Sequence, residues 1–318
     1  MLTGLPPLTL ALLLAAGVAL DLLLGEARRW HPLVGFGKLA QWLEARLNHG
    51  GLRIGRGALA WSLAVLPLSA LAWLACSFDG AAGPALHALL LYFCIGLRSL
   101  RDHTLPICAA LAEGDLARAR WLTSRIVSRD TEHAEEADLA KAGAESLLEN
   151  GNDAVFGTLF WFLVGGGAGA VLFRLANTLD AMWGYRNQRF NLFGRVAARI
   201  DDVLNYAPAR LTALSYVLLA ESGRLRAWRC WRAQAPHWSS PNAGPVMASG
   251  AGALGVSLGG AAVYDGEVEQ RPLLGAGPAA RGADILRAWR LVRRTTVLWL
   301  AAGFVLALLA GASGGAHA

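Results

Sequence analysis

Charged residues are scarce in this chain of 318 residues, where they make up 16% of the total, whereas a soluble domain carries roughly a quarter. Lysine is almost missing, because only Lys38 and Lys141 accompany the arginines among the 29 basic residues. The four cysteines have no CxxC or Cys/His ligand spacing, so neither a disulfide nor a zinc site is expected. The sequence also lacks the GxxxxGK[ST] pattern of a Walker loop.

What the chain does have is apolar residues, which make up 55% of it and come in blocks. Six blocks approach the roughly 20 residues that a helix needs to cross a bilayer. They are Leu5–Leu24, Gly57–Cys76, Ala81–Leu97, Val155–Phe173, Val203–Ala220 and Thr296–Ala310. No basic residue precedes the first block, so we expect a retained span rather than a secretory signal. The sequence predicts an all-α, polytopic membrane protein with five to six apolar segments.

Basic residues in short loops mark the cytoplasmic side of a membrane protein. Two long segments rich in arginine, 98–154 and 221–294, are therefore predicted to be cytoplasmic helical loops of a single membrane domain over residues 1–318. The central segment 174–202 is also rich in arginine, although simple alternation of six spans puts it outside.

Gly165–Gly167 weakens a straight helix in 155–173. We therefore predict that 155–173 and 203–220 form a pair of broken or re-entrant segments, which returns the loop 174–202 to the cytoplasmic side. Six plain spans are the alternative.

The soluble segments carry local signals of their own. Helices are predicted over 111–127 and over 132–149, the second capped by Asp130 or Thr131. The small residues of 238–260 let a backbone approach another helix or a ligand closely. The sequence predicts a turn-rich linker over residues 266–278.

The stretch 177–210, NTLDAMWGYRNQRFNLFGRVAARIDDVLNYAPAR, carries more charge and amide groups than a hydrophobic core accepts. Arginine is a planar fork suited to phosphate and carboxylate, and aspartate is an oxygen donor of the kind that Mg²⁺ takes beside phosphates. The combination indicates phosphoryl chemistry. A surface loop in which arginines pair with aspartates is the alternative.

Glu145 and Glu149 are four residues apart, so a helix places both carboxylates on one face. Like charges at this spacing repel unless a cation lies between them. Asp153 follows one turn later and leads into an apolar run. A solvated acidic face is the alternative.

In their order along the chain, these motifs resemble the adenosylcobinamide-phosphate synthase family of cobalamin biosynthesis. The matching pieces are Asp21 through His31-Pro32, Ser128–Thr131, Glu145–Asn150 with Asp153, 177–187, Phe193-Gly194, Ala198–Asp202, Pro208–Arg210, Ser240–Gly244 and Gly252–Gly260. The chain departs from the family pattern at Gly25-Glu26-Ala27, where Gly-Asp-Pro is common, and at Pro245-Val246, where Pro-Glu is common. The resemblance implies an ATP-dependent ligase that joins adenosylcobyric acid to aminopropanol phosphate or a related aminoalcohol phosphate.

With that resemblance, each candidate residue receives an expected role. The expected catalytic acids are Glu145, Glu149, Asp180, Asp201 and Asp202, and the expected ligands of Mg²⁺ with ATP are Glu145, Glu149, Asp153 and Asp180. The expected phosphate-binding and substrate-orienting residues are Arg129, Asn150, Asn177, Arg186, Asn187, Arg199 and Asn242. Arg186 is preferred for the amine phosphate, because Asp130 offers Arg129 an ion-pair partner.

The resemblance also implies partners and a location. The bilayer of the bacterial inner membrane, a corrinoid and an aminoalcohol phosphate are expected partners, with the active site on the cytoplasmic side. A homo-oligomer or contact with other cobalamin-pathway enzymes fits the same picture, and nucleic acid is not expected. A non-catalytic membrane sensor on a related scaffold and a transporter are the alternatives from other classes.

Overall fold

The computed structural model describes residues 4–27, 31–264 and 266–315. The chain divides into two compact units, a division that the sequence prediction of a single domain did not contain. Unit 1 comprises Met1–Leu97, Asp153–Asn205 and Leu300–Ala318, and unit 2 comprises Arg98–Asn152 and Tyr206–Trp299.

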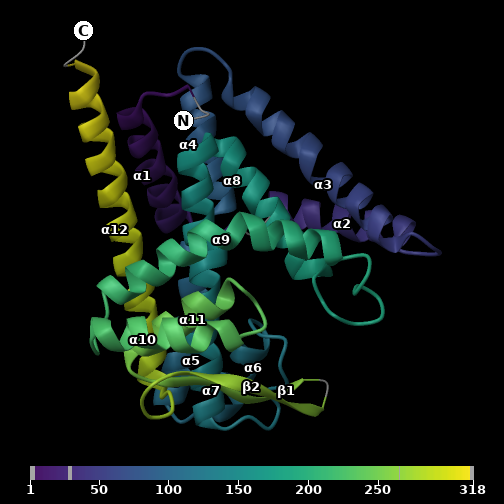
Figure 1. Cartoon of the computed structure of the whole chain (residues 1–318), viewed down its shortest axis with the longest axis vertical. Coiled ribbons are helices and arrows are strands. Elements are labelled where there is room, and N and C mark those ends of the chain that lie inside the picture. Colours follow the sequence, from purple (N-terminus) through teal and green to yellow (C-terminus); the bar gives the residue numbers. More distant parts are fainter. Residues whose placement is uncertain (1–3, 28–30, 265, 316–318) are drawn as a thin grey trace. The chain divides into compact units, whose positions relative to one another are not determined.

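Unit 1 is built from helices (Figure 1). They are α1 (Pro7–Leu24), α2 (Pro32–Leu47), α3 (Arg53–Cys76), α4 (Ala82–Cys94), α8 (Gly157–Trp183), the first part of α9 (Arg195–Leu218) and the end of α12 (Gly282–Gly315). Within the unit α8 packs against α3 and α4, and α4 packs against α1. Trp61, Leu179, Trp183 and Phe193 are buried together in a core between α2, α3 and α8.

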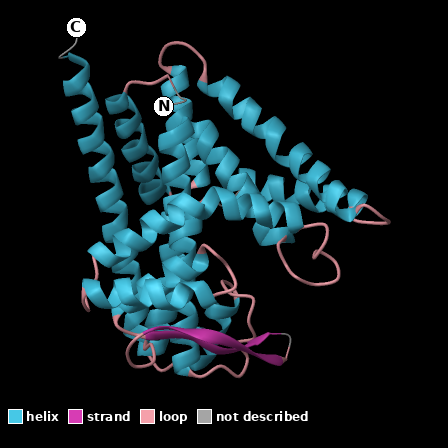
Figure 2. Cartoon of the chain, in the orientation of Figure 1, coloured by secondary structure: helices cyan, strands magenta, loops and turns pink. Residues whose placement is uncertain are grey.

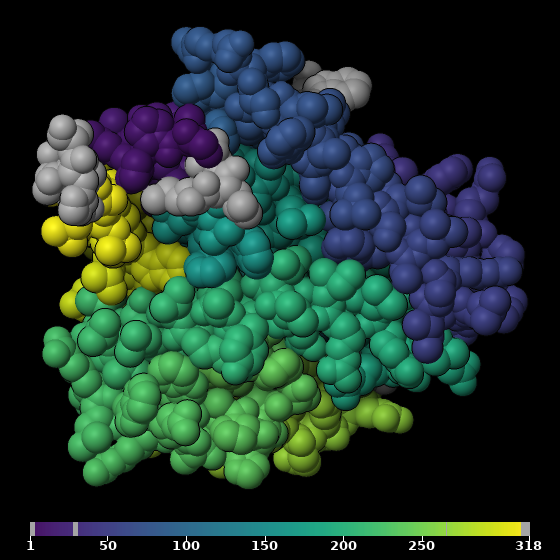
Figure 3. Space-filling model, turned by 45° about the horizontal axis from the view of Figure 1, so that its top comes forward, coloured from purple at the N-terminus to yellow at the C-terminus, as the bar shows by residue number. Residues whose placement is uncertain are grey.

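Five helical stretches of the described chain are long and apolar enough to cross a bilayer: Pro7–Leu24, Arg53–Cys76, Ala82–Ala112, Glu136–Trp183 and Gly282–Ala312. Apolar side chains of α3 such as Leu63 and Trp73 are exposed, as expected for a surface that faces lipid. The outer face of α3 forms part of the surface in Figure 3. The prediction of a helical, polytopic membrane protein is confirmed.

The predicted break between 155 and 173 is present, at Gly166 of α8 (φ 60°, ψ −150°). A positive φ is accessible to glycine because it has no Cβ. The buried Nδ1 of His87 accepts a hydrogen bond from the Gly167 N–H at 2.9 Å. This bond satisfies a backbone donor at the break, which a membrane-spanning helix requires.

The pairing of 155–173 with 203–220 as broken or re-entrant segments stays a prediction, and the run 203–220 is not a further candidate span of the described chain. It belongs instead to the longer helix α9, which starts at Arg195. The first turns of α9 are polar, and they include Asp201, Asp202 and Asn205.

Unit 2 combines shorter helices with one β-hairpin, drawn in magenta in Figure 2. Its helices are α5 (Leu97–Ala112), α6 (Leu116–Ser124), α7 (Glu136–Asn150), α10 (Arg224–Gln234), η2 (Ala235–His237) and α11 (Ala243–Leu254), together with the last part of α9 and the first part of α12. The π-helix η1 (Gly151–Phe156) continues α7, and from Asp153 onwards it belongs to unit 1. The hairpin pairs β1 (Ser257–Tyr264) with β2 (Glu267–Gly275) in antiparallel fashion. The prediction of a linker over 266–278 is therefore wrong.

Two predicted helices have different bounds. The helix expected over 111–127 is interrupted at Gly114 (φ +73°), and α6 starts anew after Asp115, whose carboxylate accepts the Arg118 N–H at 2.9 Å. Helix α7 begins at Glu136 rather than at 132. The predicted cap is wrong because Asp130 binds elsewhere, accepting the Gly266 N–H at 2.7 Å.

The small residues of 238–260 serve helix packing. All of α11 is buried, and a Cβ at Gly252 would lie 2.8 Å from the Cα of Ala227 in α10. A Cβ at Gly250 would lie 2.7 Å from Leu148 of α7. Larger residues would force these helices apart.

Candidate functional site

Unit 1 brings together five polar residues, named here the carboxylate cluster: Asp153, Asn177, Asp180, Asp201 and Asn205. The Asn177 amide donates to one Asp201 oxygen at 3.3 Å, and the Asn205 amide donates to the other at 3.2 Å. Asn205 also donates to Asp153 at 3.2 Å. The charges of Asp153 and Asp180 act on Asp201. The acids of η1, α8 and α9 thus share one neighbourhood.

The electrostatics of this cluster disfavour its ionised form. Asp201 is only 7% exposed. Burial raises the pKa of the Asp201 carboxyl well above its ordinary value, and the charges of Asp153 and Asp180 raise it further. A cation bound among these acids would relieve both effects, because it replaces lost hydration and offsets the repulsion.

The oxygen donors of the carboxylate cluster fit a hydrated divalent cation. No three Asp, Glu, His or Cys side chains of the described residues converge closely enough to enclose a metal by themselves. Mg²⁺ suits such a partial set, because it keeps several waters and takes one or two carboxylates beside substrate phosphates. Of the predicted metal ligands, Asp153 and Asp180 lie in unit 1 and Glu145 and Glu149 in unit 2.

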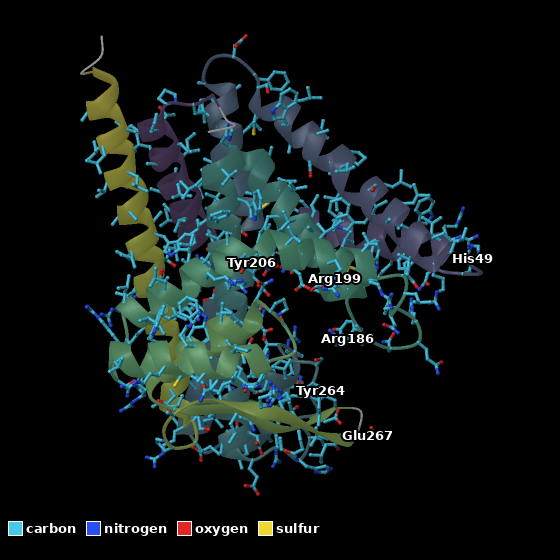
Figure 4. The ribbon with its side chains drawn as sticks, in the orientation of Figure 1. His49, Arg186, Arg199, Tyr206, Tyr264 and Glu267 are labelled. Carbon is cyan, nitrogen blue, oxygen red and sulfur yellow. The ribbon has the colours of Figure 1, made fainter. Side chains whose placement is uncertain are left out.

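Two arginines lie within electrostatic reach of Asp202, the half-buried neighbour of Asp201. Burial raises the pKa of Asp202, whereas the charges of Arg199 and Arg186 lower it. Figure 4 labels Arg186 on the loop before α9 and Arg199 on the second turn of α9. Both arginines are exposed, so an anionic ligand can reach them.

The loop 184–194, which carries Arg186, is attached to α2 through Arg189. Arg189 donates to both carboxylate oxygens of Glu44 on α2, at 2.6 and 3.1 Å. The hydrogen bond from Arg189 is the main cause that lowers the pKa of Glu44. Asn187, predicted to orient the amine, accepts the Phe190 N–H at 3.0 Å and closes a turn within this loop.

Gly184 joins this loop to the carboxylate cluster. Its N–H donates to the Asp180 carbonyl at 2.7 Å. A Cβ at this position would lie 2.2 Å from the Asp180 carboxylate oxygen Oδ1. Only glycine therefore lets the chain leave α8 so close to the Asp180 side chain.

Glu145 has a different environment, inside unit 2. It is 2% exposed, and its Oε2 accepts from Arg129 at 2.5 Å and from Arg271 of β2 at 3.3 Å. Its Oε1 accepts the N–H of Gly259, in β1, at 2.7 Å. The carboxylate thereby ties α7 to both strands of the hairpin, and its oxygens are occupied by these donors.

Arg129 does not pair with Asp130, and that prediction is wrong. The Asp130 carboxylate instead accepts a hydrogen bond from the backbone N–H of Gly266. The guanidinium group of Arg129 forms its ion pair with Glu145. Nε and Nη1 of Arg129 remain buried without a hydrogen-bond partner in the described part of the chain.

This chain is similar to known proteins over most of its length. A family model described as CobD/Cbib protein matches residues 14–292. The chain belongs to the CobD/Cbib family. A protein of Stutzerimonas stutzeri is 56% identical over 88% of this chain and 92% of its own length. One of Chromobacterium violaceum is 53% identical over 95% and 98%, and one of Clostridium perfringens is 35% identical over 81% and 85%. All three are named cobalamin biosynthesis protein CobD. No solved structure matches the chain.

The remaining predicted residues of this CobD/Cbib chain lie in unit 2. Glu149 is half-buried near the end of α7. Asn150 is exposed and donates to the Ser146 carbonyl at 3.0 Å. Asn242 is buried, and its side-chain oxygen accepts from Arg210 at 2.5 Å. The catalytic and metal-binding role of Glu149 and the substrate-orienting roles of Asn150 and Asn242 stay predictions.

Sequence reasoning missed three residues that the structure makes prominent. Asn205 bridges Asp153 and Asp201, and its spacing of four from Asp201 on one helix was a usable signal. Arg271 binds Glu145 from far along the chain, which no local pattern reveals. Arg174 lies inside the candidate span Glu136–Trp183, where a charged residue is a signal of function.

Proposed function

We propose that this protein acts in cobalamin biosynthesis as an ATP-dependent ligase. It joins the free carboxylate of adenosylcobyric acid to the amine of aminopropanol phosphate, or of a related aminoalcohol phosphate, and yields adenosylcobinamide phosphate, ADP and phosphate. The observation that carries the proposal is the carboxylate cluster of unit 1, which joins buried acids to amide donors. Membership of the CobD/Cbib family and the names of the relatives support the pathway.

We assign different roles in this reaction to different residues of unit 1. The acids of the carboxylate cluster would hold the cation of Mg²⁺–ATP, with Asp153 and Asp180 as ligands and Asn177 and Asn205 fixing the Asp201 carboxylate. Arg186 and Arg199 would hold phosphate groups, because an arginine fork donates to two phosphate oxygens at once.

The chemistry explains why phosphate and acids belong in one site. A carboxylate does not react with an amine at neutral pH, because its oxide is a poor leaving group. When bound, Mg²⁺–ATP supplies the phosphoryl group with which that oxygen departs. The amine arrives as an ammonium ion, so a carboxylate must accept its proton before it attacks.

A transporter is the second candidate, and two observations favour it. Helix α8 is broken at Gly166, and Arg174 lies within an apolar candidate span. Broken helices and charged residues at membrane depth are features of transporter sites. A transporter would not consume ATP in the manner of a ligase.

The test of the proposed function uses the full chain in lipid nanodiscs with Mg²⁺–ATP. ATP consumption should require both adenosylcobyric acid and aminopropanol phosphate, and mass spectrometry should find the amide in equal amount to ADP. Consumption with either substrate alone, or none with both, would reject the ligase.

The Arg186 prediction follows from its place on the exposed loop. Hydrogen bonds between an arginine and a charged phosphate contribute roughly 1.5–3 kcal/mol. Arg186→Lys should therefore raise the KM for the amine phosphate about tenfold or more, because lysine cannot form the two-point contact. The KM for ATP should change much less. The matched control is Arg195→Lys, since Arg195 is exposed on the same unit. A raised KM for ATP alone would assign Arg186 to the nucleotide.

The side of the membrane on which the proposed site lies can be measured. We place the protein in the bacterial inner membrane, with the loop 184–194 in the cytoplasm, because ATP is there. Single cysteines at the exposed positions Gln188 and Asn191 should label with an impermeant maleimide only from the cytoplasmic side. A cysteine at Asp79, in the exposed turn between α3 and α4, should label from the opposite side. Labelling of Gln188 and Asn191 from outside would remove the loop from ATP.

A further inference from the structure

Arg174 of α8 has no bonding partner among the described residues that explains its position. Its Nε atom is buried and lacks a hydrogen-bond partner there. Nor does Arg174 take part in any ion pair within 4 Å in that part of the chain. A guanidinium group stays charged and has five N–H donors. A buried donor without a hydrogen-bond partner is destabilising, and no described residue offsets this cost at Nε of Arg174.

The surroundings of Arg174 lead to the carboxylate cluster. The negative charges that act on its guanidinium group include those of Asp153 and Glu26. The Arg174 charge also acts on His31, at the start of α2. Asp153 belongs to the carboxylate cluster as well, since it accepts from Asn205 and acts on Asp201. Asp153 therefore interacts electrostatically with both Arg174 and Asp201, and all three residues lie in unit 1.

Two structural explanations do not account for this arginine. An arginine near the end of a span can extend its side chain to the lipid headgroups, but Arg174 lies more than two turns before the end of α8 at Trp183. A buried arginine can also be held by a structural ion pair, yet none lies within bonding distance among the described residues. A ligand can supply the acceptor that Nε lacks among the described residues.

We propose that Arg174 binds a phosphate of the nucleotide, next to the cation that the carboxylate cluster holds. A phosphate beside that cation would carry negative charge that Arg174 could share, because Asp153 interacts electrostatically with both Arg174 and Asp201. The planar fork of arginine matches two phosphate oxygens. This inference rests on the proposed ligase function and names the residue in its site that receives ATP.

The experiment measures ATP binding without turnover. The full chain in nanodiscs is titrated with Mg²⁺–ATP in the absence of both other substrates, for wild type, Arg174→Gln, Arg174→Lys and the control Arg195→Lys. Arg174→Gln should raise the Kd for Mg²⁺–ATP about tenfold or more. Arg174→Lys should fall between wild type and Arg174→Gln, and the control should bind normally. Equal binding by wild type and Arg174→Gln would overturn the inference, and the ligase proposal would stand. Failure of the wild type to bind ATP would count against the ligase itself.

Two further readouts exclude other roles of Arg174. The melting temperature of the ligand-free Arg174→Gln protein should equal or exceed that of the wild type, because a buried unpaired charge is removed, while its rise with Mg²⁺–ATP should be lost. A lower melting temperature without ligand would make Arg174 a structural residue and contradict the inference. A higher KM for aminopropanol phosphate with an unchanged Kd for ATP would assign the phosphate to the amine and overturn the nucleotide assignment.

Discussion

Replacing Asp201 by asparagine should lower kcat for amide formation by about 10²-fold or more, on the scale seen when one electrostatic group of an active site is removed. Asparagine has the same shape as the native aspartate, so the fold should be kept. The negative charge that Asp201 adds to the cation-binding acids would be lost, and one of the two amide donors, Asn177 or Asn205, would face another NH₂ group. The control is Asp79→Asn, an exposed acid outside the cluster.

The Asp201→Asn variant should also differ from the wild type in how its folding stability depends on pH. Because burial and like charges raise the pKa of Asp201 in the folded protein, folding favours its protonated form. The stability that this form contributes is present below the ordinary aspartate pKa of about 3.9 and is lost as pH rises through the raised folded pKa. In metal-free buffer, Asp201→Asn should therefore be at least as stable as the wild type at neutral pH and should lack this pH dependence. Wild-type activity in Asp201→Asn would remove the residue from the site.

Replacing Glu145 by glutamine should cause the largest loss of stability. Glu145 is buried between Arg129 and Arg271 and also accepts a hairpin N–H. Removing one partner from a buried charged group costs about 3–5 kcal/mol, because the remaining charges stay desolvated. Thermal unfolding and protease cleavage near the β-hairpin should both occur under milder conditions.

The control for Glu145 is Asp138→Asn. Asp138 pairs with Lys141 at 3.1 Å on the exposed side of the same helix, α7, and such exposed pairs contribute about 0–1 kcal/mol. If Glu145→Gln instead kept wild-type stability and lost only activity, the catalytic role expected from the sequence would be correct and the structural role assigned here would be wrong.

The parts of the fold that follow from local chemistry could be predicted. Apolar blocks such as Leu5–Leu24 and Gly57–Cys76 correspond to α1 and α3, because a bilayer requires long apolar helices. The glycines 165–167 indicated the break in α8. The β-hairpin was missed, since β1 is rich in small residues and β2 is mostly exposed, with no regular alternation of apolar and polar residues. The dipeptide Asp265-Gly266 in the sequence is the hairpin signal that was passed over.

The types of residue in the candidate site could be predicted from the sequence. The residues that these side chains contact could be predicted only in part. Asp201 and Asn177 stand in one unusual polar stretch, and the structure does join them. The spacing of Glu145 and Glu149 suggested a cation between two acids. The actual cations at Glu145 are arginines 16 and 126 residues away, which a local pattern cannot reveal. Arg174 was not selected from the sequence as a candidate site residue. It directly follows an apolar run, where a single charged residue is easily interpreted as the end of a span.

The central claim is that ATP activates the corrinoid carboxylate by phosphoryl transfer, and isotope transfer tests it most directly. Adenosylcobyric acid labelled with ¹⁸O in its free carboxylate is incubated with the full chain in nanodiscs, Mg²⁺–ATP and aminopropanol phosphate, and the inorganic phosphate is analysed by mass spectrometry. The proposed reaction predicts that one labelled oxygen appears in phosphate for each amide formed. Amide formation with unlabelled phosphate, or amide formation without ATP, would contradict it.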